Sequence, residues 1–305
     1  MILCWLLCLV AIMATLHLTL GVPPSAYDLR HCLSSCGDVD ITYPFGVGAR
    51  CSRPGFELIC NTTTKPPKLF FGDPTTAITG ISKSGSYVQA SVVFNIATTP
   101  GVLRTYSRSW NVPRKNLKTM DDFRTILVIL GCGIDVHLFD GDANVLRGYC
   151  RSECTNLAVM EKTVAQRPCN GMGCCTIALQ DGVRSFRFTV TQVEEQTPVV
   201  GNATIKAFLI PYQESPYEFK YSTADLLSDK INARTIGATS AFFIPIISDQ
   251  PNCKVAQSGL KNSTYACHTS DCWDEAKGRG YTCFCSDNFD YGNPYLVNGC
   301  SQGTP

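Results

Sequence analysis

Cysteine is the residue that most constrains what this chain can fold into. The sequence holds 18 cysteines among 305 residues. Cytosolic proteins rarely carry so many, because their thiols are kept reduced. Cys4 and Cys8 lie in the apolar first 21 residues, and the sixteen that follow are an even number, enough for eight disulfides. The count therefore predicts a disulfide-rich protein of an oxidising compartment.

The sixteen cysteines fall into three groups along the chain. The groups hold four, six and six members, so each can pair within itself, and three disulfide-bonded modules are the simplest organisation. We place these modules at residues 28–118, 119–250 and 251–305, with breaks in polar or proline-rich segments near residues 111–115 and 248–252. The groups are Cys32, Cys36, Cys51 and Cys60; Cys132, Cys150, Cys154, Cys169, Cys174 and Cys175; and Cys253, Cys267, Cys272, Cys283, Cys285 and Cys300.

The N-terminal segment predicts export from the cytosol. Residues 2–20 contain no charged side chain, and small residues and prolines follow them. This order is typical of a secretory signal peptide, which we assign to residues 1–21. The alternative is an uncleaved membrane anchor, because an apolar run of this length can just span a bilayer. The next most apolar run, residues 241–247, is short and contains a proline, so we expect a buried or edge strand there.

Three Asn-X-Ser/Thr tripeptides lie in the exported part, beginning at Asn61, Asn202 and Asn262. In a secreted chain such tripeptides are acceptors for surface glycosylation. We expect all three asparagines to be glycosylation sites.

The hydrophobic pattern predicts a mainly β protein. Residues 123–130 form a short apolar run suited to a strand buried on both faces, and residues 183–193 alternate as in a half-buried strand. Residues 87–96 are rich in β-branched and aromatic side chains and are predicted to form a hairpin with residues 77–82. One short helix is expected after Ser222.

Charge is distributed unevenly along the chain. Between Arg30 and Lys118 there are eleven Lys and Arg but four Asp and Glu, a net charge of +7, whereas the whole chain carries +1. A basic first module joined to an acidic remainder suggests a polyanionic partner, and the alternative is a solvated surface with no partner. The near-zero overall balance argues against nucleic-acid binding.

The sequence lacks the usual catalytic motifs. It contains no His-Glu-x-x-His, no Gly-x-Ser-x-Gly and no P-loop. The neighbours Glu194 and Glu195 would point to opposite faces of a strand, so they cannot flank one glycosidic bond. Cys-x3-Cys spacings can ligate zinc, but an even count in an exported chain favours disulfides. We expect no enzymatic activity, no metal and no cofactor.

Two stretches resemble a known family. The first runs Cys36-Gly-Asp-Val-Asp-Ile-Thr-Tyr-Pro-Phe-Gly46, followed by Cys51, Pro54-Gly-Phe-Glu-Leu58 and Cys60. It resembles the galacturonan-binding ectodomain of plant wall-associated receptor kinases. The second, Gly280-Tyr-Thr-Cys-Phe-Cys285 through Cys300, resembles the EGF-like repeat of the same receptors, and the cysteine-rich segment between the two resembles their linking region.

The resemblance carries several implications. It implies an ectodomain without the family's transmembrane and kinase parts, ending in an EGF-like module at residues 251–305. By resemblance, the pairs in that module are Cys253–Cys272, Cys267–Cys283 and Cys285–Cys300. In the middle group, adjacent Cys174 and Cys175 point to opposite sides of an extended chain, so we expect them to have different partners.

The resemblance also implies a ligand. Galacturonate carries a planar carboxylate, which Arg can bind with two parallel hydrogen bonds and Lys as a point charge. The Tyr43-Pro44-Phe45 aromatics either stack on sugars or pack the core, and packing is favoured in a small module. The candidate ligand-binding residues are Arg50, Arg53, Lys65, Lys68, Lys83, Arg104 and Arg108.

The expected function is that of a secreted polysaccharide-binding protein of the plant cell wall. Its expected partners are acidic pectin and, secondly, membrane receptor kinases. One alternative is a protein–protein interaction module without polysaccharide binding, since EGF-like repeats commonly mediate contacts. Another is a truncated or membrane-anchored fragment of a longer receptor.

Overall fold

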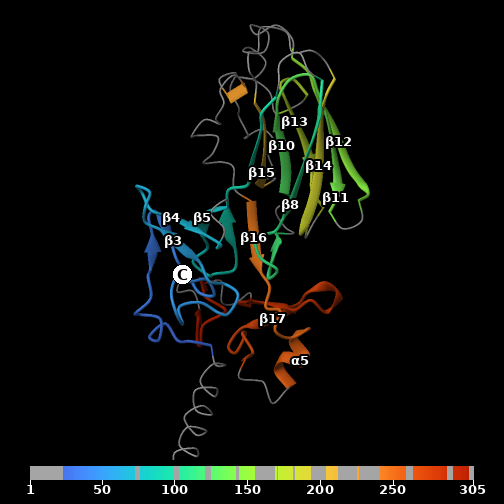
Figure 1. The fold of residues 1–305 in the computed structure, drawn as a ribbon. Helices are drawn as coiled ribbons and strands as arrows, with labels where there is room; N and C mark the ends of the chain where they lie inside the picture. The colour runs from blue at the N-terminus through green and yellow to red at the C-terminus, as the bar shows by residue number, and fades with distance from the viewer. Residues whose placement is uncertain are drawn as a thin grey trace, which may run out of the picture. The chain divides into compact units, whose positions relative to one another are not determined.

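The structure, a computed structural model, is mainly β, as predicted (Figure 1). It folds into two compact units, which we describe separately. Unit 1 comprises Met1–Gly72, Ile81–Tyr87 and Pro245–Pro305, and unit 2 comprises Asp73–Gly80 and Val88–Ile244. The structure describes residues 23–72, 76–98, 103–120, 125–141, 144–154, 169, 171–180, 183–193, 204–211, 225–226, 241–258, 264–286 and 291–301.

Unit 2 contains two four-stranded antiparallel sheets (Figure 1). The first has the order β13-β10-β15-β7 and the second the order β12-β11-β14-β8. Their strands are β7 (Val93–Ile96), β8 (Thr105–Asn111), β10 (Thr125–Leu130), β11 (Ile134–Asp140), β12 (Leu146–Ser152), β13 (Cys174–Ala178), β14 (Ser185–Gln192) and β15 (Ile205–Pro211).

The inner faces of these sheets pack against each other. Phe94 on β7 lies with its ring centroid 5.3 Å from that of Phe188 on β14, in an edge-to-face arrangement. Every residue of β10 is buried, and β14 alternates between buried and half-buried positions. Both predictions, the doubly buried strand at residues 123–130 and the half-buried strand at residues 183–193, are therefore confirmed.

Four more strands lie beside one another in the order β5-β6-β16-β9. Their bounds are β5 (Ala77–Ile81), β6 (Val88–Ala90), β9 (Leu117–Thr119) and β16 (Ala241–Pro245). β5 and β6 are neighbouring strands, as the predicted hairpin requires, and the apolar run at residues 241–247 contains the expected short strand, β16. The single strand predicted at residues 87–96 is wrong, because β6 pairs with β16 whereas β7 pairs with β15 of another sheet.

Unit 1 is built from small hairpins. Near its N-terminal end β1 (Ser35–Cys36) pairs with β2 (Val39–Asp40), and β3 (Ile59–Asn61) pairs with β4 (Lys68–Phe70). The C-terminal part of the unit has a short helix and two further strand pairs, β17 with β18 and β19 with β20. Their bounds are α5 (Cys253–Ser258), β17 (Asp271–Asp274), the 3-10 helix η2 (Ala276–Gly278), β18 (Tyr281–Phe284), β19 (Tyr291–Gly292) and β20 (Cys300–Ser301).

The sixteen cysteines form eight disulfides, and each disulfide joins two members of one predicted group. The last group has the three pairs that the resemblance implies, and Cys174 and Cys175 have different partners. The boundaries of the three predicted modules stay a prediction. The pairs are Cys32–Cys51, Cys36–Cys60, Cys132–Cys154, Cys150–Cys175, Cys169–Cys174, Cys253–Cys272, Cys267–Cys283 and Cys285–Cys300.

Several predicted features fall outside the described residues: the signal peptide at residues 1–21, the pair Glu194 and Glu195, and the glycosylation sites Asn202 and Asn262. Of the helix expected after Ser222, the structure describes Asp225 and Leu226, which are helical. Among the described residues, no helix has the length and apolar character needed to cross a bilayer.

Candidate functional site

The candidate site lies in the first cysteine-rich part of unit 1. Cys36–Cys60 joins β1 to β3, and Cys32–Cys51 ties the segment before β1 to the loop before β3. The turn between β1 and β2 contains Gly37 at φ +60°, where a Cβ atom would lie 2.2 Å from the carbonyl oxygen of Pro67. Glycine is thus required for the two hairpins to approach so closely.

The Tyr-Pro-Phe-Gly segment forms core rather than ligand surface. Phe45 is 1% exposed and packs edge-to-face on Phe56 with ring centroids 5.5 Å apart. Pro44 and Gly46 are also buried, and the Leu58 amide donates to the Gly46 carbonyl at 2.7 Å. The predicted packing role is confirmed for these residues, which leaves the basic side chains as the ligand candidates.

Arg53 differs from the other basic candidates because its guanidinium is occupied. It donates to Asp249 Oδ2 at 2.8 Å and to the Thr264 carbonyl at 2.5 Å, and its side chain is 11% exposed. It also lies beside the Tyr43 hydroxyl: burial raises the pKa of Tyr43, while the nearby Arg53 charge and hydrogen bond act in the opposite direction. The contacts indicate a structural role for Arg53. Its acidic partner lies 196 residues away in sequence, so no local pattern could have indicated it.

Four other basic candidates in unit 1 are exposed: Arg50, Lys65, Lys68 and Lys83. Within the described part of the chain, none of their side chains has a hydrogen bond or an ion pair. Lys65 and Lys68 flank Pro66-Pro67 in the segment that leads into β4, whereas Arg50 and Lys83 lie on two separate loops. These charges remain available to an incoming anion.

Arg104 and Arg108 lie in unit 2, so the structure divides the predicted set between the two units. Both are exposed, and Arg108 on β8 donates to the carbonyl of Ser107 at 2.9 Å. Arg108 pairs in register with Phe188 of β14, whose side chain is buried. Their role in ligand binding stays a prediction.

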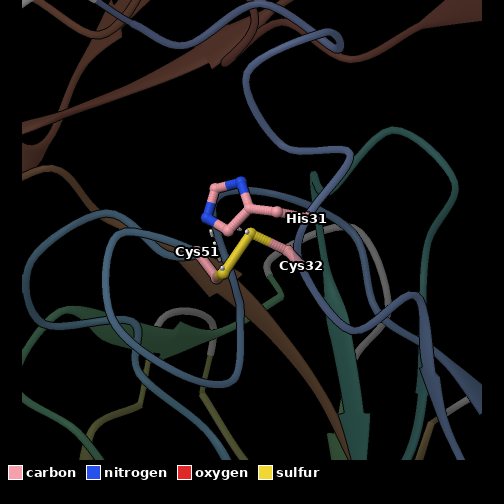
Figure 2. A group of neighbouring side chains, drawn as sticks. All are labelled: His31, Cys32 and Cys51. Carbon is pink, nitrogen blue, oxygen red and sulfur yellow. Dashed lines mark hydrogen bonds between the residues drawn. A yellow bond between two sulfur atoms is a disulfide. The ribbon is translucent and has the colours of Figure 1, made fainter.

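One cluster has the residue types of a metal site but not its chemistry. His31 Nε2 lies 3.6 Å from Cys32 Sγ and 3.7 Å from Cys51 Sγ (Figure 2). The two sulfur atoms are bonded to each other, and metal ligation requires thiolates. The intact disulfide therefore leaves the imidazole as the one ligand of this cluster.

Asn61 is the one predicted glycosylation site that the structure describes. It ends β3, is half-buried, and its Oδ1 accepts hydrogen bonds from the backbone amide and the hydroxyl of Thr63 at 2.9 and 2.7 Å. Its glycosylation stays a prediction.

Comparison with known proteins supports the resemblance. Residues 32–92 match the family described as "Wall-associated receptor kinase galacturonan-binding". Over 279 residues the chain is 26% identical to Wall-associated receptor kinase 2 of Arabidopsis thaliana, covering 90% of this chain and 34% of the relative. It is 28% identical over 303 residues to Wall-associated receptor kinase 1 of the same plant, covering 96% of this chain and 37% of the relative.

The predicted similarity to the extracellular part of wall-associated receptor kinases is therefore confirmed. The chain spans about a third of the length of the relatives that it matches. No solved structure matches the chain.

Proposed function

We propose that this protein binds acidic pectin, a polymer of galacturonate, through the basic side chains of unit 1. One observation carries the proposal: Arg50, Lys65, Lys68 and Lys83 are exposed and have no acidic partner in the described part of the chain. All four lie in the segment that matches the galacturonan-binding family. Cationic side chains without internal partners suit a repeating carboxylate ligand.

The proposed role is recognition rather than catalysis. The relatives are named receptor kinases. The similarity covers nearly all of this chain but only about a third of the length of each relative. We place the protein outside the cell, at the cell wall, with membrane receptor kinases as a second class of partner. In this arrangement the protein senses or competes for pectin fragments that such receptors also bind.

Replacing Arg50, Lys65, Lys68 and Lys83 together by glutamine should weaken binding of oligogalacturonides by about 30-fold, because each exposed charge pair contributes about 0.5 kcal/mol. Isothermal titration of the oxidised, glycosylated protein at low salt measures the change. Raising the salt to about 1 M shortens the screening length to about 3 Å and should abolish most binding by the unsubstituted protein.

The matched control is Lys254→Gln, an exposed lysine of α5 outside the candidate site, and it should leave the affinity unchanged. Arg104→Gln with Arg108→Gln forms a separate arm that measures the contribution of unit 2. Methyl-esterified pectin should not bind. Equal binding of the esterified polymer, or unchanged affinity in the fourfold variant, would contradict the proposal.

A further inference from the structure

The C-terminal part of unit 1 contains a cavity of about 290 Å³ whose polar lining has no assigned role. Three short segments of the chain line it. They contribute His268–Asp271, Ser286, and the two residues Asn298 and Cys300. No sequence pattern indicates this cavity, because its segments are apart in the chain and share no motif. All of them belong to unit 1.

The cavity walls are held in place by hydrogen bonds and a disulfide. The Thr269 hydroxyl accepts a hydrogen bond from the backbone amide of Asn298 at 3.0 Å. The Ser270 hydroxyl donates one to the Pro294 carbonyl at 2.8 Å. The Cys285–Cys300 disulfide joins the other two walls. A cavity fixed in this way needs little reordering when a ligand enters, which favours binding.

The most informative polar group on the wall is the carboxylate of Asp271. This exposed residue begins β17, and within the described residues its side chain has no hydrogen bond and no ion pair. A carboxylate is an acceptor with a full negative charge, so it selects a ligand that brings donors and positive charge. It also disfavours galacturonate at this position, which separates this cavity from the proposed pectin site.

An aromatic pair made of the exposed Trp273 and the half-buried Phe284 adjoins Asp271. Trp273 lies two residues further along β17, on the same face, and Phe284 pairs directly with Asp271 across the hairpin. The two rings are 4.6 Å apart between centroids, and Trp273 is 66% exposed. Tryptophan is enriched at protein interfaces, because its ring offers a large apolar area together with an N–H donor.

The hairpin that carries this pair is rigid. Cys272 and Cys283 pair in register on its other face, and each forms a disulfide with a different segment of unit 1, to Cys253 and Cys267. Aromatic side chains on a rigid support lose little entropy on binding and commonly supply most of an interface's binding energy.

We propose that the Asp271 cavity and the adjoining Trp273–Phe284 pair form a docking site for a Lys or Arg side chain of a partner protein. The cation pairs with the Asp271 carboxylate inside the cavity. The apolar stem of the same side chain, or the cation of a neighbouring residue, packs on the Trp273 ring, where a cation–π contact adds to the ion pair. The occupant follows from charge complementarity: one unpaired anion beside an electron-rich ring fits a basic segment.

The test uses the whole protein and defined peptides. Short peptides containing a central Arg or Lys are titrated by NMR and by Trp fluorescence, with a Gln-containing peptide of equal length as the uncharged probe. The Arg and Lys peptides should bind and perturb Trp273, and the Gln peptide should bind about tenfold more weakly or not at all. Asp271→Asn and Trp273→Ala should each weaken the Arg peptide by about tenfold.

The matched control is Asp38→Asn, an exposed acidic residue elsewhere in unit 1, which should leave peptide binding unchanged. Equal binding of the Arg and Gln peptides, unchanged binding in Asp271→Asn, or binding of a neutral oligosaccharide in place of the peptides would each overturn the proposal. Oligogalacturonide binding is measured on Asp271→Asn and Trp273→Ala and should not change, so failure of this site is distinguishable from failure of the pectin site.

Discussion

Replacing Arg53 by alanine should lower the free energy of unfolding of unit 1 by about 2 kcal/mol. The guanidinium is 11% exposed and Asp249 is 39% exposed, so the cost falls between that of an exposed pair and that of a buried one. The alanine variant also loses the hydrogen bond from Arg53 to the Thr264 carbonyl. Urea unfolding monitored by circular dichroism measures the loss.

The Arg53→Ala variant also tests whether Arg53 has a structural role while the exposed cations bind the ligand. Under conditions where the alanine variant is folded, its oligogalacturonide affinity should stay within about twofold of the unsubstituted protein. Lys68→Ala, an exposed lysine at the start of β4, is the matched control and should show the opposite pattern: unchanged stability and weaker binding. A folded Arg53→Ala protein with strongly reduced affinity would assign Arg53 to the ligand site instead.

Unit 1 should lose stability steeply between pH 10 and 12 because of Tyr295. Burial of its hydroxyl raises the pKa of Tyr295 to about 12, from an ordinary value of 10. The stabilisation is fully present below pH 10, where the phenol is neutral in both states. It is lost as the pH rises towards 12, because the unfolded chain ionises first. At pH 12, where the folded-state phenol is half ionised, the loss amounts to about 2 kcal/mol.

Tyr295→Phe should reduce this alkaline sensitivity by the share that Tyr295 contributes, since phenylalanine cannot ionise. The measurement is the urea unfolding midpoint at pH 9, 10, 11 and 12, with brief exposure so that the disulfides stay intact. Tyr27→Phe, a change at a 70% exposed tyrosine, is the control and should leave the pH dependence unaltered. Tyr281 has the same direction of shift, to about 12, also from burial, so a reduced loss should persist in Tyr295→Phe. An unaltered profile in Tyr295→Phe would show that Tyr295 does not cause the loss.

The strands that sequence predicted well are those whose pattern reflects one environment along their whole length. The apolar run at residues 123–130 and the alternation at residues 183–193 each report burial directly, and β10 and β14 follow them. The run at residues 87–96 failed because its composition is β-forming throughout, while its two halves pair in different sheets. Sheet membership depends on distant strands, which local composition does not encode.

The sequence predicted which residue types form the candidate site, but not how those side chains are arranged in space. An excess of Lys and Arg near the N-terminus is visible in sequence, but the identity of the cations that acquire internal partners is not. The sequence offers no reason to assign different roles to Arg53 and Lys68. In the fold, Arg53 forms an ion pair with Asp249, whereas Lys68 stays exposed. Similarly, Trp273 is an ordinary strand residue by pattern, and its exposure is a property of the assembled hairpin.

The disulfides of this protein have a consequence for its biosynthesis. Every disulfide closes a loop between cysteines 5 to 25 residues apart, so during the proposed export each can form soon after its segment enters an oxidising compartment. Some noncovalent contacts of unit 1 instead join distant segments: the side-chain amide of Asn293 donates to the Tyr43 carbonyl 250 residues earlier. Oxidation can therefore finish near the N-terminus long before Arg53 meets Asp249. On the proposed secretory route, a nascent chain would hold a cross-linked first segment that lacks these contacts, which favours chaperone binding until Asp249 and Asn293 have been synthesised.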